Sequence, residues 1–165
     1  MARKERVQKT NAMRELERGG VAYTVVTYDA TNEDLSTGVG VRISEMLGED
    51  PDSAFKTLVT TGGHVTCCIP VAEKLDLKKA AAAAGEKTLQ MMHVRDLEPT
   101  TGYVRGGCTP VGMKKQFPTL IDETAQLFDE ISISGGRRGL SLTVNPEELA
   151  HFLDATFADI VRDDR

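Results

Sequence analysis

The chain has 165 residues, of which 40% are hydrophobic and 27% are charged. This length fits a single domain spanning residues 1–165, and the composition excludes a disordered or fibrous protein. Lysine and arginine total 20 against 25 acidic residues, and the formal net charge of −5 argues against a broad, sequence-independent nucleic-acid binder.

The sequence also bears on cellular location. No apolar stretch approaches the roughly 18 residues that a membrane helix needs, and the N-terminus does not lead into a signal peptide. Three cysteines (Cys67, Cys68 and Cys108) cannot all pair internally, and two of them are adjacent, so no disulfide framework is predicted. We therefore expect a cytoplasmic protein without a membrane anchor.

The first half of the chain predicts two helices and three strands. Apolar spacing over residues 9–18, followed by Gly19 and Gly20, predicts a helix and its end. Residues 21–28 are rich in β-branched and aromatic side chains, which favour a strand. A polar loop over 29–37 and a helix at about 40–47 follow. The alternating residues 54–61 and the strand at 64–69, joined through two glycines, predict a hairpin.

The second half adds further helices and strands. Residues 72–84 predict a helix ending at Gly85, and a short helical turn is expected at 93–97. Asn145 and Pro146 are typical of a helix start. Its apolar face would use Leu149, Phe152, Leu153, Phe157 and Ile160. The remaining strands are predicted at residues 88–92, 119–121, 127–133 and 140–144.

Several of these strands are joined directly rather than through helices. About seven strands and four helices in this order predict a mixed α/β fold of the α+β type. The expected architecture is a mixed, partly antiparallel sheet or barrel flanked by helices.

Lys56 is the first candidate functional residue. Strand alternation places it on the same face as Leu58 and Thr60. A lysine there is either an edge residue that extends to water or a buried ammonium that stabilises negative charge. The pattern alone leaves both interpretations open.

Two glycine-rich turns, residues 105–110 and 134–139, are the second candidate feature. Without a Cβ atom, glycine lets backbone N–H groups approach a carboxyl oxygen or a phosphate closely. Hairpin turns also use Gly-Gly pairs, so a purely structural role stays open at each turn.

A protein nucleophile and a metal site are both poorly supported. The sequence has no Gly-x-Ser-x-Gly elbow, and cysteines in an apolar strand are usually inert. Cys108 is the better thiol candidate, but no histidine partner can be assigned to it. His64, Cys67 and Cys68 do not predict zinc, because adjacent strand residues point to opposite faces. We expect no metal and no cofactor.

Other polar residues carry weaker signals. His93 and His151 lie in helical contexts, where a capping or surface role is commoner than a catalytic one. Three basic pairs could contact phosphates or be ordinary solvated surface. These pairs are Lys78-Lys79, Lys114-Lys115 and Arg137-Arg138.

Several segments considered together are far more specific than any one motif. They are Phe55-Lys56-Thr57-Leu58, Leu75-Asp76-Leu77-Lys78-Lys79, Thr101-Gly102-Tyr103, Gly106-Gly107-Cys108-Thr109-Pro110, Gly112-Met113-Lys114-Lys115, Pro118-Thr119-Leu120-Ile121-Asp122 and Ser134-Gly135-Gly136-Arg137-Arg138-Gly139-Leu140. In these segments the chain resembles, nearly end to end, the YbaK family of bacterial Cys-tRNA(Pro) deacylases, within the prolyl-tRNA synthetase-associated editing domains.

The resemblance implies an editing-domain fold and hydrolysis of the ester that joins cysteine to tRNA(Pro), with Cys-tRNA(Cys) as a further substrate. It implies charged tRNA(Pro) and prolyl-tRNA synthetase as partners. The family's essential lysine falls on Lys56, which is the expected catalytic residue. The expected substrate-binding residues are Tyr28, Thr57, Gly106, Gly107, Thr109, Ser134 and Gly135.

Two positions depart from the family pattern, and other functions stay open. Val39 stands where close relatives have an aromatic residue, and Ser141 stands where they have an aspartate; neither is expected to be catalytic. Deacylation of Ala-tRNA(Pro) is one alternative, and a non-catalytic module that binds tRNA or the synthetase is another. Within the deacylase hypothesis, attack by the substrate's own thiol competes with attack by an activated water.

Overall fold

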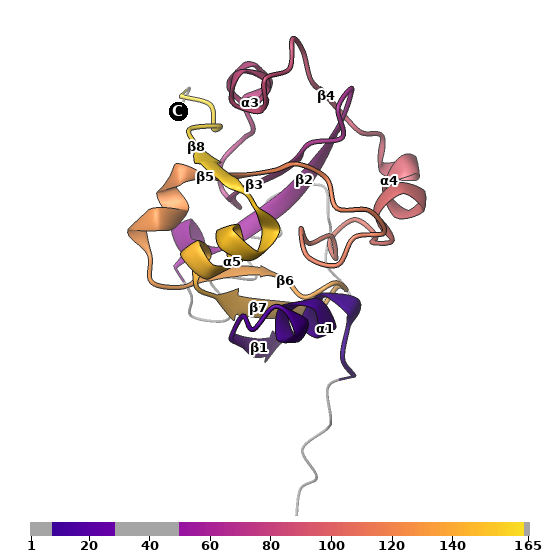
Figure 1. The fold of residues 1–165 in the computed structure, drawn as a ribbon, viewed down its shortest axis with the longest axis vertical. Helices are drawn as coiled ribbons and strands as arrows, with labels where there is room; N and C mark the ends of the chain where they lie inside the picture. Colours follow the sequence, from indigo (N-terminus) through magenta and orange to yellow (C-terminus); the bar gives the residue numbers. More distant parts are fainter. Residues whose placement is uncertain (1–7, 29–49, 164–165) are drawn as a thin grey trace, which may run out of the picture.

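The computed structural model describes residues 8–28 and 50–163 (Figure 1). The predicted polar loop at 29–37, the predicted helix at 40–47 and Val39 lie outside the described residues.

Four α-helices and two short 3-10 helices lie in the described part of the chain. The α-helices are α1 (Asn11–Arg18), α3 (Leu77–Ala84), α4 (Val94–Thr101) and α5 (Pro146–Leu153). The 3-10 helices are η1 (Pro51–Ser53) and η2 (Glu123–Leu127). The strands are β1 (Tyr23–Thr27), β2 (Phe55–Thr61), β3 (Thr66–Pro70), β4 (Gln90–Met91), β5 (Thr119–Asp122), β6 (Ile131–Ser134), β7 (Leu140–Val144) and β8 (Thr156–Ala158).

The described strands form two sheets. The smaller sheet has the order β1-β7-β6 and is antiparallel throughout. The larger sheet has the order β4-β2-β3-β5-β8, in which the predicted β2–β3 hairpin is antiparallel and the β3–β5 and β5–β8 pairs are parallel. The mixed α/β prediction is confirmed, whereas the barrel alternative is wrong, because the described strands make two open sheets.

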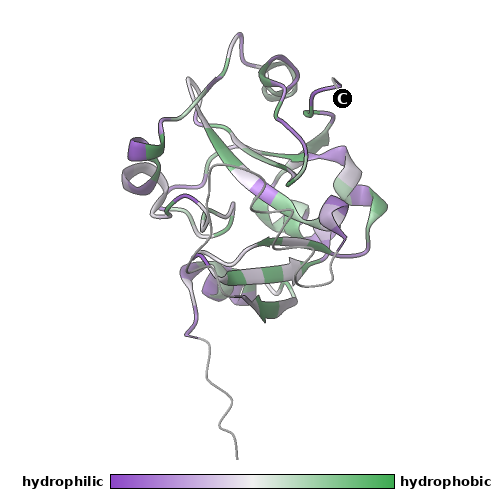
Figure 2. Ribbon diagram, turned by 180° about the vertical axis from the view of Figure 1, so that it is seen from behind, coloured by the Kyte–Doolittle hydropathy of each residue, from purple (hydrophilic) through white to green (hydrophobic). Residues whose placement is uncertain are grey.

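The core lies where these sheets and helices meet. One buried cluster combines α1, α5 and the inner faces of β6 and β7, and includes Leu16, Ile133 and Leu142. A second cluster packs α3 against β3 and β5. Figure 2 shows the hydrophobic strands at the centre and hydrophilic stretches on the peripheral helices. The described part of the chain contains no helix with the length and apolar character to span a membrane.

The end of the last helix differs from the prediction. Helix α5 stops at Leu153 because Asp154 takes a left-handed conformation, with φ 54°, and its N–H caps the helix. Phe157 therefore lies in strand β8, paired with Ile121 of β5, and Ile160 follows that strand. The expectation that both residues continue the helical face is wrong. The end of the helix was not predicted, because no glycine or proline marks it in the sequence.

Three other boundaries also moved. Helix α3 begins only at Leu77, because the Asp76 side chain accepts hydrogen bonds from the N–H groups of the first turn. The expected turn at 93–97 extends to Thr101 as α4, with Pro99 inside the helix. The strand predicted at 127–133 is shorter than expected: Leu127 ends η2, and the strand, β6, begins only at Ile131.

Candidate functional site

Lys56 lies in β2, opposite Ile69 of β3, and is half-buried. Leu58, two residues further along the same strand face, packs against the buried cluster between α3, β3 and β5. Thr57 faces the other way, where its hydroxyl lies 3.9 Å from the Cys68 sulfur. The alternation predicted from the sequence is therefore confirmed, and Lys56 belongs to a partly apolar face.

The Lys56 ammonium has no hydrogen-bond or ion-pair partner within residues 8–28 and 50–163. Burial lowers its pKa below the usual 10.5, the Glu73 carboxylate opposes this effect, and Lys74 adds to it. A cation in such surroundings lacks full hydration and, among the described residues, an acidic group in direct contact. It is therefore suited to stabilise a negative charge that develops nearby.

Strands β2 and β6 come together close to Lys56. A parallel bridge joins Ala54 to Ser132, and within these two fully described strands no ladder continues beyond it. Lys56 and Ser134 each lie two residues past that bridge, on the faces that carry Ala54 and Ser132. The fold thus places two of the predicted site residues at matching positions where the strands separate.

The two glycine-rich turns pack directly against each other. A Cβ atom on Gly107 would lie 2.8 Å from the Arg137 Cα atom, so only glycine fits there without movement. The N-cap residue of α1, Thr10, donates a hydrogen bond of 2.6 Å to the carbonyl of Gly135. A Cβ atom on Gly135 would lie 2.7 Å from the Leu140 side chain, so close packing accounts for both glycines, while their contact with a ligand stays a prediction.

Tyr28 and Thr109 lie beside these turns. The backbone N–H of Tyr28 donates to the carbonyl of Gly139, which places the end of β1 against the second turn. Thr109 belongs to the first turn and is fully buried, yet its hydroxyl has no hydrogen-bond partner among the described residues. A buried hydroxyl without a partner is costly, and such groups are often explained by a role in a site.

A pair of buried serines was missed by the sequence reasoning. The hydroxyls of Ser132 and Ser141 lie 2.6 Å apart, and Ser141 also lies 3.2 Å from the carbonyl of Ile133. Ser141 is paired with Ser134 across the β6–β7 ladder, so all three serines share one face. The available signal was the alternation of serine and isoleucine in β6.

The cysteines are unsuited to nucleophilic attack. Burial raises the pKa of Cys67 and of Cys108 to about 12, and it also raises the pKa of Cys68. All three are therefore protonated at neutral pH, in agreement with the interpretation of inert thiols. Cys67 and Cys68 belong to different core clusters, as expected for adjacent strand residues.

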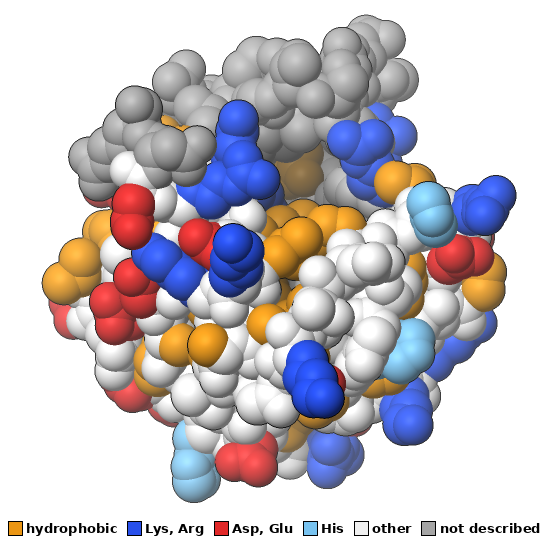
Figure 3. All heavy atoms as spheres, turned by 90° about the horizontal axis from the view of Figure 1, so that it is seen from above, with side chains coloured by type: hydrophobic (Ala, Val, Ile, Leu, Met, Phe, Trp, Pro, Cys, Tyr) orange, Lys and Arg blue, Asp and Glu red, His pale blue; other side chains and the backbone are white. Residues whose placement is uncertain are grey.

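The basic pairs differ in how far they are engaged. The Lys79 ammonium contacts Asp159 and Asp163, Lys114 donates to the Pro99 carbonyl, and Arg137 donates to the Gln8 carbonyl. Lys115 is exposed and has no such contact within the described residues. Figure 3 shows lysine and arginine side chains around a hollow with an apolar floor.

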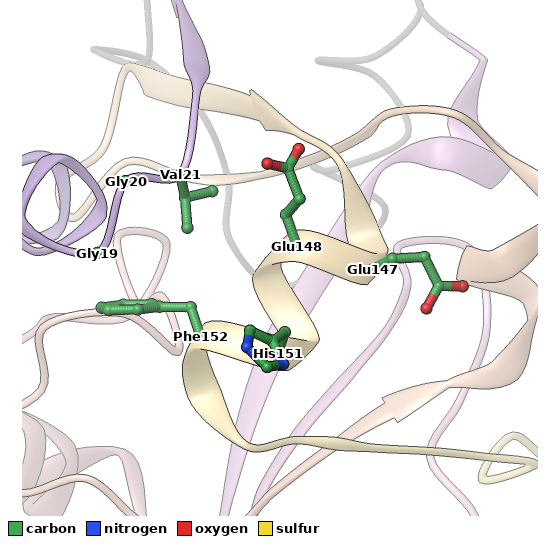
Figure 4. A pocket seen from close by; sticks show the side chains of 7 residues that line it. All are labelled: Gly19, Gly20, Val21, Glu147, Glu148, His151 and Phe152. Carbon is green, nitrogen blue, oxygen red and sulfur yellow. The ribbon is translucent and has the colours of Figure 1, made fainter.

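A separate depression of about 520 Å³ lies between the end of α1 and helix α5 (Figure 4). Its lining residues are Gly19, Gly20, Val21, Glu147, Glu148, His151 and Phe152. None of the predicted site residues takes part in it. Two glutamates are also unfavourable for phosphate groups, so we do not regard it as the candidate site.

Comparisons with known proteins show which family the chain resembles. A family model described as the aminoacyl-tRNA editing domain matches residues 41–152. The chain is 45% identical over 163 residues to a protein of Enterococcus faecalis (strain ATCC 700802 / V583), named as a candidate Cys-tRNA(Pro)/Cys-tRNA(Cys) deacylase, EbsC. The match covers 97% of this chain and 98% of that protein.

Solved structures show the same fold. A crystal structure of a candidate trans-editing enzyme for prolyl-tRNA synthetase gives a TM-score of 0.80 at 24% identity, over 92% of this chain and 95% of that one. The hypothetical protein APE2540 gives 0.81 at 20% identity, over 93% and 100%. From the matched family model and the full-length relative, the chain belongs to the aminoacyl-tRNA editing domain family.

Proposed function

We propose that this protein hydrolyses Cys-tRNA(Pro), with Cys-tRNA(Cys) as a further substrate, and that Lys56 is its catalytic residue. The observation that carries the proposal is the half-buried ammonium of Lys56, which has no partner among the described residues and lies at a position matching that of Ser134. The 45% identity to a protein named for these two substrates supports the choice of amino acid.

The proposed chemistry needs a cation and polar groups close to one ester carbonyl. The thiol of the substrate cysteine attacks that carbonyl, a carbon–sulfur bond forms, and the bond from the carbonyl carbon to the ribose oxygen breaks. The thiol proton ends on the ribose oxygen, and water then opens the resulting thiolactone. Lys56 and the backbone N–H groups near Gly106 stabilise the negative charge on the carbonyl oxygen.

This mechanism does not need a nucleophile from the protein. The buried cysteines, whose pKa values are raised, are consistent with that division of labour. Proline and cysteine have similar volumes, so a synthetase pocket separates them poorly and a second site has to remove the error. Attack by an activated water at the same carbonyl is the rival mechanism.

A side-by-side deacylation assay tests the function. Wild-type protein is mixed with Cys-tRNA(Pro), Cys-tRNA(Cys), Ala-tRNA(Pro) and Ser-tRNA(Pro), and ester loss is compared with the spontaneous rate. We expect rapid loss of cysteine and slow loss of alanine. Slow loss of serine supports thiol attack, whereas rapid loss supports water. Binding of Cys-tRNA(Pro) without any cleavage would replace the proposal with the non-catalytic module.

We also propose that the protein acts together with prolyl-tRNA synthetase. The net charge of −5 opposes binding of the tRNA backbone, and the Lys79 and Arg137 side chains already make contacts within the chain. Binding of tRNA alone should therefore be weak and should fall further as salt increases. Added synthetase should raise the deacylation rate at low tRNA concentration, because a tethered substrate has a higher effective concentration.

A further inference from the structure

His64 has an unusual backbone conformation. It follows Gly62 and Gly63 in the β2–β3 hairpin and has a φ of 49°. Among the described residues, only His64 and Asp154 combine a side chain with a positive φ. Glycine would adopt this conformation with less strain, and strained residues in loops are often found at functional sites. The histidine side chain at this position therefore calls for an explanation.

The imidazole ring of His64 is held by a stacking contact. Its centroid lies 5.3 Å from that of Phe117, and the two ring planes are inclined by 24°. Phe117 is only 7% exposed, whereas His64 is exposed. One face of the imidazole therefore covers Phe117, and the ring still presents a flat surface to solvent. Exposed rings of this kind are what unpaired nucleobases stack on.

The stacked pair is connected to the candidate site. Phe117 belongs to the buried cluster that contains Tyr103 and Cys108, which flank and form the first glycine-rich turn. Ile69, the partner of Lys56, is five residues from His64, which corresponds to about 16 Å along a strand. A stacked strand rises about 3.4 Å per nucleotide, so a few nucleotides cover that distance.

A cation lies close by in the sequence. Lys115 precedes Phe117 by two residues, is exposed, and has no hydrogen bond or ion pair with the described part of the chain. An aromatic surface and a nearby cation are what single-stranded nucleic acids bind to, since the ring contacts a base and the cation a phosphate.

We propose that the His64–Phe117 stack is a platform for an unpaired nucleobase near the acylated 3′ end of the tRNA, with Lys115 as its phosphate contact. This inference rests on the proposed function, because it requires charged tRNA as the substrate. It assigns to the hairpin tip a share in binding the RNA, apart from the chemistry at Lys56.

Two substrates separate an RNA contact from a structural role. In His64→Asn the side chain tolerates positive φ but lacks the ring. We expect kcat/KM for Cys-tRNA(Pro) to fall about fivefold or more. For cysteinyl-adenosine, which has no neighbouring nucleotide, it should be unchanged. His64→Phe should restore the rate on tRNA, and His93→Asn, at an exposed histidine without a side-chain cap bond, should have no effect. Equal loss on both substrates, or no loss on either, would overturn the proposal.

A binding measurement gives an independent readout that needs no catalysis. A short single-stranded RNA ending in CCA, with 2-aminopurine in place of one base, should lose fluorescence on binding wild type, because stacking quenches this base. The quenching should be weaker with His64→Asn and with Lys115→Ala. If the wild type is active and neither variant reduces the quenching, the platform is refuted and the proposed function stands. If the wild type quenches the fluorescence but does not deacylate Cys-tRNA(Pro), the proposed function is refuted and the platform stands.

Discussion

At the scale of single residues, the proposed function depends on Lys56. Its ammonium is partly removed from water, lacks a counter-ion among the described residues, and has a lowered pKa. Below this lowered pKa, folding has to bury a charged group, and that cost disappears as pH rises from the folded pKa towards 10.5. Such a residue is expected to reduce stability at neutral pH in exchange for function.

Replacing Lys56 with methionine tests this cost. At neutral pH the free energy of unfolding of Lys56→Met should rise by about 0.5 kcal/mol or more, because the partly desolvated charge is gone. The gain should shrink as pH rises through the lowered pKa of Lys56. Urea unfolding at pH 7 and pH 10 measures both. A less stable variant at pH 7 would contradict the burial argument.

Thr109 is the second residue that we expect to reduce stability in exchange for function. The Thr109 hydroxyl is buried and has no hydrogen-bond partner among the described residues. Replacing it with a methyl group in Thr109→Val should therefore leave the protein as stable as wild type or up to about 1 kcal/mol more stable. If the hydroxyl binds substrate, KM for Cys-tRNA(Pro) should rise, whereas Thr109→Ser should retain activity. Thermal unfolding and steady-state kinetics of both variants provide the test, and a marked loss of stability would show that the hydroxyl has a structural partner.

At the scale of elements, the sequence predicted most helices and strands but not every boundary. The β2–β3 hairpin, β7 and the glycine that ends α3 follow from alternation and turn chemistry, which are local signals. Strand β8 could not be found this way, because it depends on pairing with β5 and on a left-handed aspartate. The Ser132–Ser141 pair was missed for a similar reason, since it forms only across two paired strands.

The contact between the two glycine-rich turns is an element-scale feature that can be tested. Gly107→Ala introduces a methyl group 2.8 Å from a backbone atom of the other turn, so the turns have to separate. We expect a loss of about 1–3 kcal/mol in unfolding free energy and reduced deacylation. Gly63→Ala is a suitable control, because the nearest atoms there belong to the flexible Glu86 side chain. Equal stability of the two variants would argue against tight packing of the turns.

Asp122 joins three elements at the end of β5. It is 1% exposed, and its carboxylate accepts hydrogen bonds from the Thr124 hydroxyl and from the N–H of Ile160. Asp122→Ala leaves these donors without an acceptor and should reduce the unfolding free energy by about 2–3 kcal/mol. Asp50→Ala, at an exposed cap, should cost about 1 kcal/mol or less. Chemical denaturation of both variants measures the difference, and a small effect at Asp122 would contradict its joining role.

At the scale of the whole molecule, the fold brings residues distant in sequence to one place. Lys56 and Ser134 lie at matching positions on neighbouring strands only because β2 and β6 meet at the Ala54–Ser132 bridge between the two sheets. No local pattern predicts that bridge: strand alternation singled out Lys56 and the glycines singled out the turn at 134–139, but their roles came from the family resemblance. The contact between the two glycine-rich turns was not predicted either, because it joins segments about 30 residues apart.

The most direct test of the account compares two lysines. Lys56→Ala and Lys74→Ala both remove a cation from the same region, but Lys74 is exposed whereas Lys56 is half-buried. We predict that Lys56→Ala lowers kcat/KM for Cys-tRNA(Pro) by about a hundredfold or more, as loss of an oxyanion-stabilising group does, while its thermal unfolding stays close to wild type. Lys74→Ala should keep wild-type activity. A folded Lys56→Ala variant with full activity would contradict the central claim.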